Sequence, residues 1–199
     1  MSQQAVPVVG LTGGMGAGKS TALEILRRRG AAVLSTDAVV HELIESDPVR
    51  QALVARFGEE IAPGGVVDRA AVATRAFADD DGRAWLEGLL WPLVGERVAE
   101  WVEQVRRRTP PPRAAVIEVP LLFESGLTDG YDATLAVVAD EPLRRERAAA
   151  RGHALAEERS SRQLPQEEKA RKATFVVRND GTEGDLEREL SAVLDKLGR

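Results

Sequence analysis

Eight residues near the N-terminus have the types and spacing of a phosphate-binding loop. Residues 13–20 read G-G-M-G-A-G-K-S and fit the pattern G-x-x-x-x-G-K-S. In such a loop, glycines let backbone N–H groups turn toward phosphate oxygens, lysine reaches the β- and γ-phosphates, and the hydroxyl coordinates Mg²⁺. Here Lys19 and Ser20 would have these roles. The candidate phosphate-binding residues are Gly14, Met15, Gly16, Ala17, Gly18, Lys19, Ser20 and Thr21.

The residues around this loop favour a nucleotide site over a chance match. An apolar run at 6–11 precedes it, and a helical pattern follows over 19–29. The positive N-terminal end of that helix would point at the bound anion. The dinucleotide pattern G-x-G-x-x-G does not fit, because Lys19 stands where its last glycine belongs.

Asp37 is the candidate for the chemistry itself. It follows an apolar run at 31–35, so it lies at the carboxyl edge of the expected sheet, where ligands bind in open α/β sheets. A carboxylate there can accept the proton of an attacking hydroxyl or orient Mg²⁺ through water. It can equally be a helix N-cap, since a helical run begins at this point. The residues alone leave both readings open.

Composition narrows the class of protein. With 199 residues, 43% of them hydrophobic, the chain can bury one core with small appended subdomains. A net charge of −5 argues against a general nucleic-acid or anionic membrane surface. No cysteine and two histidines exclude disulfides and disfavour Cys/His zinc sites. Residues 1–14 show no basic leader, and no apolar stretch nears the roughly 20 residues of a membrane span. We expect a cytoplasmic protein.

Apolar runs alternate with helical patterns along the chain, which predicts an α/β fold with a five-stranded parallel sheet. Helical patterns over 68–78 and 83–108 suggest a helical insertion, with Pro92 kinking or dividing the second. The expected strands are 6–12, 31–35, 114–119, 131–138 and 174–177, and a closing helix covers 185–197.

Positive charge is concentrated in one segment. Residues 144–172 hold nine Arg or Lys against five Glu, a balance of +4 in a chain of −5. This can be a solvated helical face. It is also where an arginine-bearing lid of a phosphate-loop protein would close on a triphosphate, with one or two arginines on phosphate.

Several motifs together resemble the dephospho-CoA kinase family, from the first strand to the turn at 179–181. The resemblance implies a three-layer P-loop kinase fold with a helical substrate subdomain and a lid. It also implies ATP- and Mg²⁺-dependent phosphorylation of the ribose 3′-hydroxyl of dephospho-CoA, the last step of coenzyme A synthesis. The matching segments are G-L-T-G-G-M-G-A-G-K-S-T at 10–21, S-T-D at 35–37, W-P-L-V at 91–94, V-P-L-L-F-E at 119–124 and R-Q-L-P at 162–165 with E-E-K at 167–169.

The resemblance also implies roles for residues. Asp37 would activate the 3′-hydroxyl, Lys19 and Arg147 would stabilise the transferring phosphoryl group, and Ser20 would hold the metal. Asn179 and Gly181 would border the adenine. The acceptor site would be lined by Leu121, Leu122, Phe123 and Glu124, although the leucines can equally be core residues.

Two positions depart from the family pattern. Ser35 stands where the family has the first aspartate of D-A-D, which removes any metal role of that carboxylate. Trp91 stands where the family has histidine, and an indole offers stacking or packing but no proton exchange near neutral pH.

The resemblance predicts one kinase domain over 1–199. Its core would be 1–59, 113–150 and 174–199, with a helical substrate-binding insertion at 60–112 and a lid at 151–173. The expected partner is dephospho-CoA, without nucleic acid or membrane, in a monomer or weak homo-oligomer. Alternatives are another small-molecule or nucleoside-monophosphate P-loop kinase and a nucleotide-dependent regulator. A GTPase is disfavoured because no N-K-x-D motif occurs.

Overall fold

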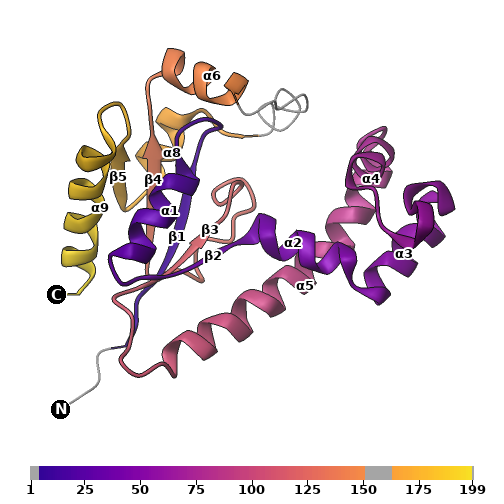
Figure 1. Ribbon diagram of the computed structural model, residues 1–199, viewed down its shortest axis with the longest axis horizontal. Helices are drawn as coiled ribbons and strands as arrows, with labels where there is room; N and C mark the ends of the chain where they lie inside the picture. The colour runs from indigo at the N-terminus through magenta and orange to yellow at the C-terminus, as the bar shows by residue number, and fades with distance from the viewer. Residues whose placement is uncertain (1–4, 151–162, 199) are drawn as a thin grey trace. The chain divides into compact units, whose positions relative to one another are not determined.

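The computed structural model describes residues 5–150 and 163–198. The chain divides into two compact units, one of residues 1–35 with 102–199 and one of residues 36–101. Figure 1 shows a sheet with helices in the first unit and helices alone in the second.

The first unit is built on a five-stranded sheet. Its strands are β1 (Val8–Gly13), β2 (Ala32–Ser35), β3 (Ala115–Glu118), β4 (Ala133–Val138) and β5 (Phe175–Arg178). Every pairing is parallel, in the order β2-β3-β1-β4-β5, which confirms the predicted sheet. The order changes direction at β1, because β2 and β3 lie on one side of it and β4 and β5 on the other. Ligands of open α/β sheets bind at the carboxyl ends of strands beside such a point.

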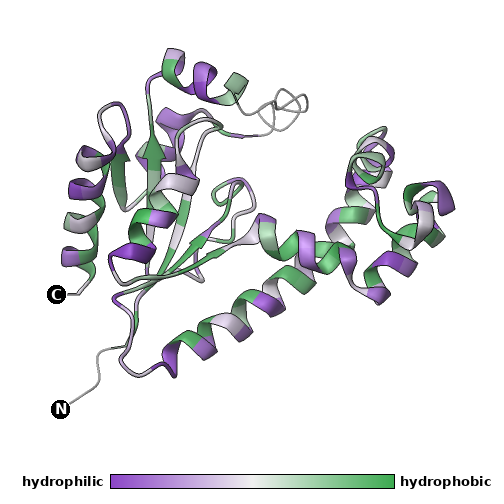
Figure 2. Cartoon of the chain, viewed as in Figure 1, coloured by the Kyte–Doolittle hydropathy of each residue, from purple (hydrophilic) through white to green (hydrophobic). Residues whose placement is uncertain are grey.

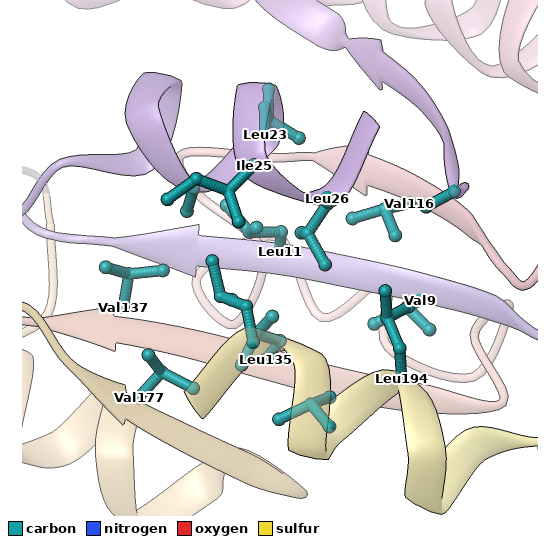
Figure 3. Close-up of a cluster of buried hydrophobic side chains, with 14 of the residues drawn as sticks. Val9, Leu11, Leu23, Ile25, Leu26, Val116, Leu135, Val137, Val177 and Leu194 are labelled. Carbon is teal, nitrogen blue, oxygen red and sulfur yellow. The ribbon is translucent and has the colours of Figure 1, made fainter. Parts of the chain in front are cut away.

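Two helices cover one face of this sheet. Helices α1 (Lys19–Arg28) and α9 (Glu183–Leu197) place their apolar sides on β1, β4 and β5, with Leu26, Leu135 and Leu194 inside the cluster (Figure 3). Figure 2 shows that the strands are mainly hydrophobic, as expected where both faces are covered. A capping box between Thr182 and Asp185 starts α9 two residues earlier than the sequence predicted.

Two further helices of the first unit lie near the carboxyl ends of the strands. Helix α6 (Glu141–Ala150) follows β4, and α8 (Gln166–Lys172) begins directly after Pro165 and precedes β5. The expected lid, 151–173, is described only from residue 163 onward; its first twelve residues lie outside the described part of the chain.

The second unit contains α2 (Thr36–Glu45), α3 (Asp47–Phe57), the short 3₁₀ turns Glu59–Ile61 and Pro63–Gly65, α4 (Arg69–Ala76) and most of α5 (Asp80–Arg106). Helix α5 continues through Pro92, so of the two expected effects of this proline the division of the helix was wrong, and the kink stays a prediction. The reason is that one proline removes a single N–H donor, and the following turns retain theirs. The ring of Phe57 packs edge-on against that of Trp85 at a centroid distance of 5.4 Å.

None of the described helices has both the length and the apolar character that crossing a membrane requires.

Candidate active site

The phosphate-binding loop connects the central strand β1 to α1. Gly16 and Gly18 have φ angles of 73° and 94°, in the left-handed region that glycine adopts without strain. Helix α1 begins at Lys19, has no side-chain cap, and carries no acidic residue in its first turn. The positive end of this helix is therefore left open to an anion, as the sequence predicted.

The two residues expected to act on phosphate and metal lie at the start of α1. Lys19 Nζ donates hydrogen bonds to the carbonyl oxygens of Gly13 and Gly14, at 3.1 and 3.3 Å, so its ammonium group lies across the loop. Ser20 is exposed, and its hydroxyl has no hydrogen-bond partner in the described part of the chain. An uncommitted hydroxyl fits Mg²⁺, which proteins usually hold through one or two side chains together with phosphates and waters.

A pocket of about 300 Å³ lies beside the loop and is lined by Asn179 and Gly181, the two residues predicted to border the adenine, and by Arg147, predicted to act on the phosphoryl group. Asn179, at the end of β5, is buried and donates from Nδ2 to the carbonyl of Ala17 at 2.9 Å. Arg147 of α6 donates from its guanidinium to the carbonyl of Asn179 at 3.0 Å. This volume is at the lower end of small-molecule sites and suits a single base. The lining residues are Gly18, Thr21, Arg147, Ala150, Asn179, Gly181 and Glu183.

The segment expected to line the acceptor site follows β3. Leu122 is fully buried and packs against Gly10, so in this conformation it supports the segment and does not face a ligand. Leu121 and Phe123 are half-buried. Glu124 is mostly buried, with 14% of its side chain exposed, and is engaged in an ion pair.

The partner of Glu124 is Lys169 of α8, a residue whose side chain is completely buried. Lys169 Nζ lies 2.9 Å from Glu124 Oε1 and donates to the carbonyl of Pro120 at 2.6 Å and to Thr12 Oγ1 at 3.4 Å. Burial lowers the pKa of Lys169 from 10.5, and the hydrogen bond and charge of Glu124 oppose this. Glu124 Oε1 also accepts a hydrogen bond from the Leu164 backbone at 2.7 Å.

One buried lysine therefore joins the end of β1, the segment after β3 and the described end of the expected lid. Sequence reasoning counted Lys169 among the cations of its segment and within the family motif at 167–169, and it missed this role. No signal in the sequence separated Lys169 from Arg171 and Lys172, which lie on the same helix and are exposed.

Asp37 lies in the second unit, in the first turn of α2 and two residues after the end of β2. It is exposed, and within 36–101 no described group makes a hydrogen bond or ion pair with its carboxylate. The N-cap alternative thus has no hydrogen bond to support it. Trp91 is 50% exposed, so it is not a core residue of its unit. Ser35 is the last residue of β2.

Glu118 is a second carboxylate that the sequence analysis did not single out. It is the last residue of β3, 8% exposed, in register with Leu11 of β1 and Ser35 of β2. It therefore lies at the carboxyl edge of the sheet beside the strand that carries the loop. The signal was a single charged residue inside the apolar run of 114–119.

Comparison with known proteins agrees with this arrangement. The family model for dephospho-CoA kinase matches residues 7–185. A dephospho-CoA kinase from Deinococcus radiodurans is 41% identical over 192 residues, covering 95% of this chain and 91% of the relative. The chain belongs to the dephospho-CoA kinase family.

Solved structures show the same fold. The crystal structure of TT1252 from Thermus thermophilus has a TM-score of 0.80 and 34% identity, and the match covers 98% of this chain and 99% of that one. Dephospho-CoA kinase from Campylobacter jejuni, at 20% identity, has a TM-score of 0.65 and covers 96% of this chain and 97% of its own. The prediction of a P-loop kinase fold is confirmed.

Proposed function

We propose that this protein transfers the γ-phosphoryl group of ATP to the ribose 3′-hydroxyl of dephospho-CoA, giving coenzyme A. The observation that carries this proposal is the family match over 7–185, which spans the loop, the acceptor segment and the α8 region. The open N-terminus of α1 and the adjoining pocket supply the nucleotide half of such a site.

On the nucleotide side, one group of residues holds the phosphates and another encloses the adenine. Backbone N–H groups of 14–21 and Lys19 hold the β- and γ-phosphates, and Lys19 leaves its loop carbonyls to neutralise charge that develops on the transferring group. Asn179, Gly181 and Arg147 enclose the adenine in the pocket of about 300 Å³. Arg147 is also the proposed clamp of the transition state, and for this role its guanidinium would leave the Asn179 carbonyl for the transferring phosphoryl group.

On the acceptor side, Asp37 accepts the proton of the 3′-hydroxyl as that oxygen attacks phosphorus. Its exposure, and the absence of a partner within the described second unit, leave the carboxylate available for this role. Leu121 and Phe123 line the acceptor pocket, while Leu122 and Glu124 hold its segment in place.

We also propose Mg²⁺ as the metal. When bound, Mg²⁺ would neutralise charge on the phosphates and align them for in-line transfer. Ser20 would coordinate it, and Glu118 would hold one of its waters. The described residues contain no group of three or more acidic or histidine side chains able to hold a metal by themselves, which agrees with a metal held mainly by phosphates.

The test is a coupled ADP-release assay with purified protein, ATP and Mg²⁺, using dephospho-CoA, AMP and shikimate as separate acceptors. Dephospho-CoA should turn over at least 100-fold more efficiently than the others, and an analogue lacking the ribose 3′-hydroxyl should not react. Preferred turnover of AMP or shikimate would replace this function with that of another small-molecule kinase. ATP hydrolysis without any acceptor phosphorylation would favour a nucleotide-dependent regulator.

Further parts of the proposal concern the domain organisation, the location and the partners of the protein. Residues 60–112 form a substrate-binding insertion, 151–173 act as a lid, and the protein works in the cytoplasm as a monomer or weak homo-oligomer, without nucleic acid. A net charge of −5 supports the last point. Light scattering after size-exclusion chromatography, with and without dephospho-CoA, tests the oligomeric state.

A further inference from the structure

Arg144 of α6 lies directly against the phosphate-binding loop. A Cβ atom added to Gly14 would come within 2.3 Å of Arg144 Nη1, and one added to Gly16 would come within 2.2 Å of the Arg144 carbonyl oxygen. Both distances are shorter than the 3.0 Å that Cβ contacts in proteins essentially never pass. At Gly16 the obstacle is the backbone of Arg144, so this position requires glycine, whereas at Gly14 it is the end of the flexible Arg144 side chain, which shows how closely the guanidinium approaches the loop.

The guanidinium of Arg144 has no partner to neutralise it among the described residues. Its Nε is buried and makes no hydrogen bond there, and no ion pair of Arg144 occurs in that part of the chain. A backbone hydrogen bond and one from Gln166 lower the pKa of Glu167, and the charge of Arg144 adds to this, but no hydrogen bond joins Arg144 and Glu167. A buried donor left unpaired costs free energy, and this cost is removed when an acceptor arrives.

The neighbouring arginines of α6 differ from Arg144 in this respect. Arg145 is exposed and forms an ion pair with Glu141, and Arg147 donates to the carbonyl of Asn179. Each has a partner already. Among the described arginines of α6, Arg144 thus contacts the loop and also has partly buried N–H donors that lack an acceptor.

We propose that Arg144 is a phosphate-binding residue of the ATP site, donating to the β- or γ-phosphate held by the loop, in addition to Arg147, which in this structure donates to the Asn179 carbonyl. The inference rests on the proposed function for its nucleotide. A planar guanidinium matches phosphate oxygens with two parallel N–H bonds, which an ammonium group cannot reproduce. Arg144 would thus add positive charge opposite Lys19, on the side of the loop that faces α6.

The test measures nucleotide binding without any acceptor, by calorimetry with AMP, ADP and ATP in the presence of Mg²⁺. Arg144→Gln should weaken ATP or ADP binding by about 10- to 100-fold, the range of a charged hydrogen bond, and leave AMP binding within twofold. The affinity of Arg144→Lys for ATP and ADP should lie between that of Arg144→Gln and that of the wild type. Arg145→Gln is the matched control, one residue away with the same change, and should bind all three as the wild type does.

Equal affinity of Arg144→Gln and wild type for ADP and ATP would overturn the assignment. An equal loss for AMP would also overturn it, because Arg144 would then only hold the loop in shape. If Arg144→Gln does not fold by circular dichroism, Arg144→Lys must show the loss confined to ADP and ATP on its own. ATP binding is measured independently of turnover. If the protein binds ATP but does not phosphorylate dephospho-CoA, the proposed acceptor is refuted and the role of Arg144 is not. If the wild type binds no ATP, both proposals are refuted.

Discussion

Replacing Lys169 with methionine should destabilise the protein strongly, because it leaves Glu124 as a charge without a partner in the interior. The lysine is fully buried and makes three polar contacts, to Glu124, Pro120 and Thr12. Breaking such a pair from one side typically costs about 3–5 kcal/mol. A domain has only about 5–15 kcal/mol of total stability. At roughly 2–4 °C per kcal/mol for a chain of this size, Tm should fall by about 6–20 °C.

The measurement is urea unfolding followed by circular dichroism at 222 nm. Tryptophan fluorescence is less suitable, because all three tryptophans lie within residues 36–101 and report on the other unit. Lys172→Met is the matched control: the same substitution on the same helix, at an exposed position, should change stability by less than about 0.5 kcal/mol.

A double mutant separates the charge from the packing. Glu124→Gln keeps an oxygen for the Leu164 backbone but removes the charge, so Lys169→Met with Glu124→Gln should be more stable than Lys169→Met alone by about 1–2 kcal/mol. A Lys169→Met protein within about 1 kcal/mol of the wild type would refute the reasoning. So would a double mutant that loses the sum of both single effects.

The same pair predicts a pH dependence. Burial lowers the pKa of Lys169, with Glu124 opposing, so the folded state releases this proton at a lower pH than the unfolded state. Between the folded pKa and 10.5 the unfolded state binds more protons, and stability therefore rises with pH. Across this pH window, the free energy of unfolding of the wild type should rise relative to that of Lys169→Met.

Four other perturbations follow from the site and the helix ends. Asp37→Asn should fold normally and keep its KM for ATP while kcat falls by about 100-fold or more; near wild-type turnover would remove this residue from the mechanism. Lys19→Ala should also fold but lose both ATP binding and turnover in the same assays. Glu118→Gln should raise the Mg²⁺ concentration needed for half-maximal rate, and an unchanged requirement would exclude it from the metal site. Hydrogen bonds from Thr182 lower the pKa of Asp185 from 3.8 to about 2; the stability it contributes above pH 3.8 should be lost as pH falls toward 2, a slope absent from acid unfolding of Asp185→Asn.

The sheet and the phosphate-binding loop could be predicted because both depend on local sequence. Apolar runs of strand length, separated by helical patterns, gave five parallel strands within one or two residues of their observed ends. The loop pattern and the motifs after β2 and β3 led to the family that the comparisons confirm. The division of α5 at Pro92, one of two predicted effects, was wrong, since a local rule about proline took no account of the turns on either side.

Residues that act through distant partners could not be predicted in the same way. Lys169 is 157 positions from Thr12 and 49 from Pro120 along the chain, and only the fold brings these groups together. Nothing in its own sequence separates a buried lysine from the exposed cations around it. The proposed roles of Asp37 and of the acceptor segment remain predictions for the experiments above.

The contact between Asn179 and Ala17 has a consequence for local opening. This hydrogen bond connects the phosphate-binding loop to the end of β5, an edge strand of the sheet that pairs only with β4. Edge strands fray more readily than central ones, so amide protons of 175–178 and of the loop should exchange with deuterium at linked rates. A nucleotide that occupies the loop would then slow exchange at the sheet margin, although no phosphate touches it.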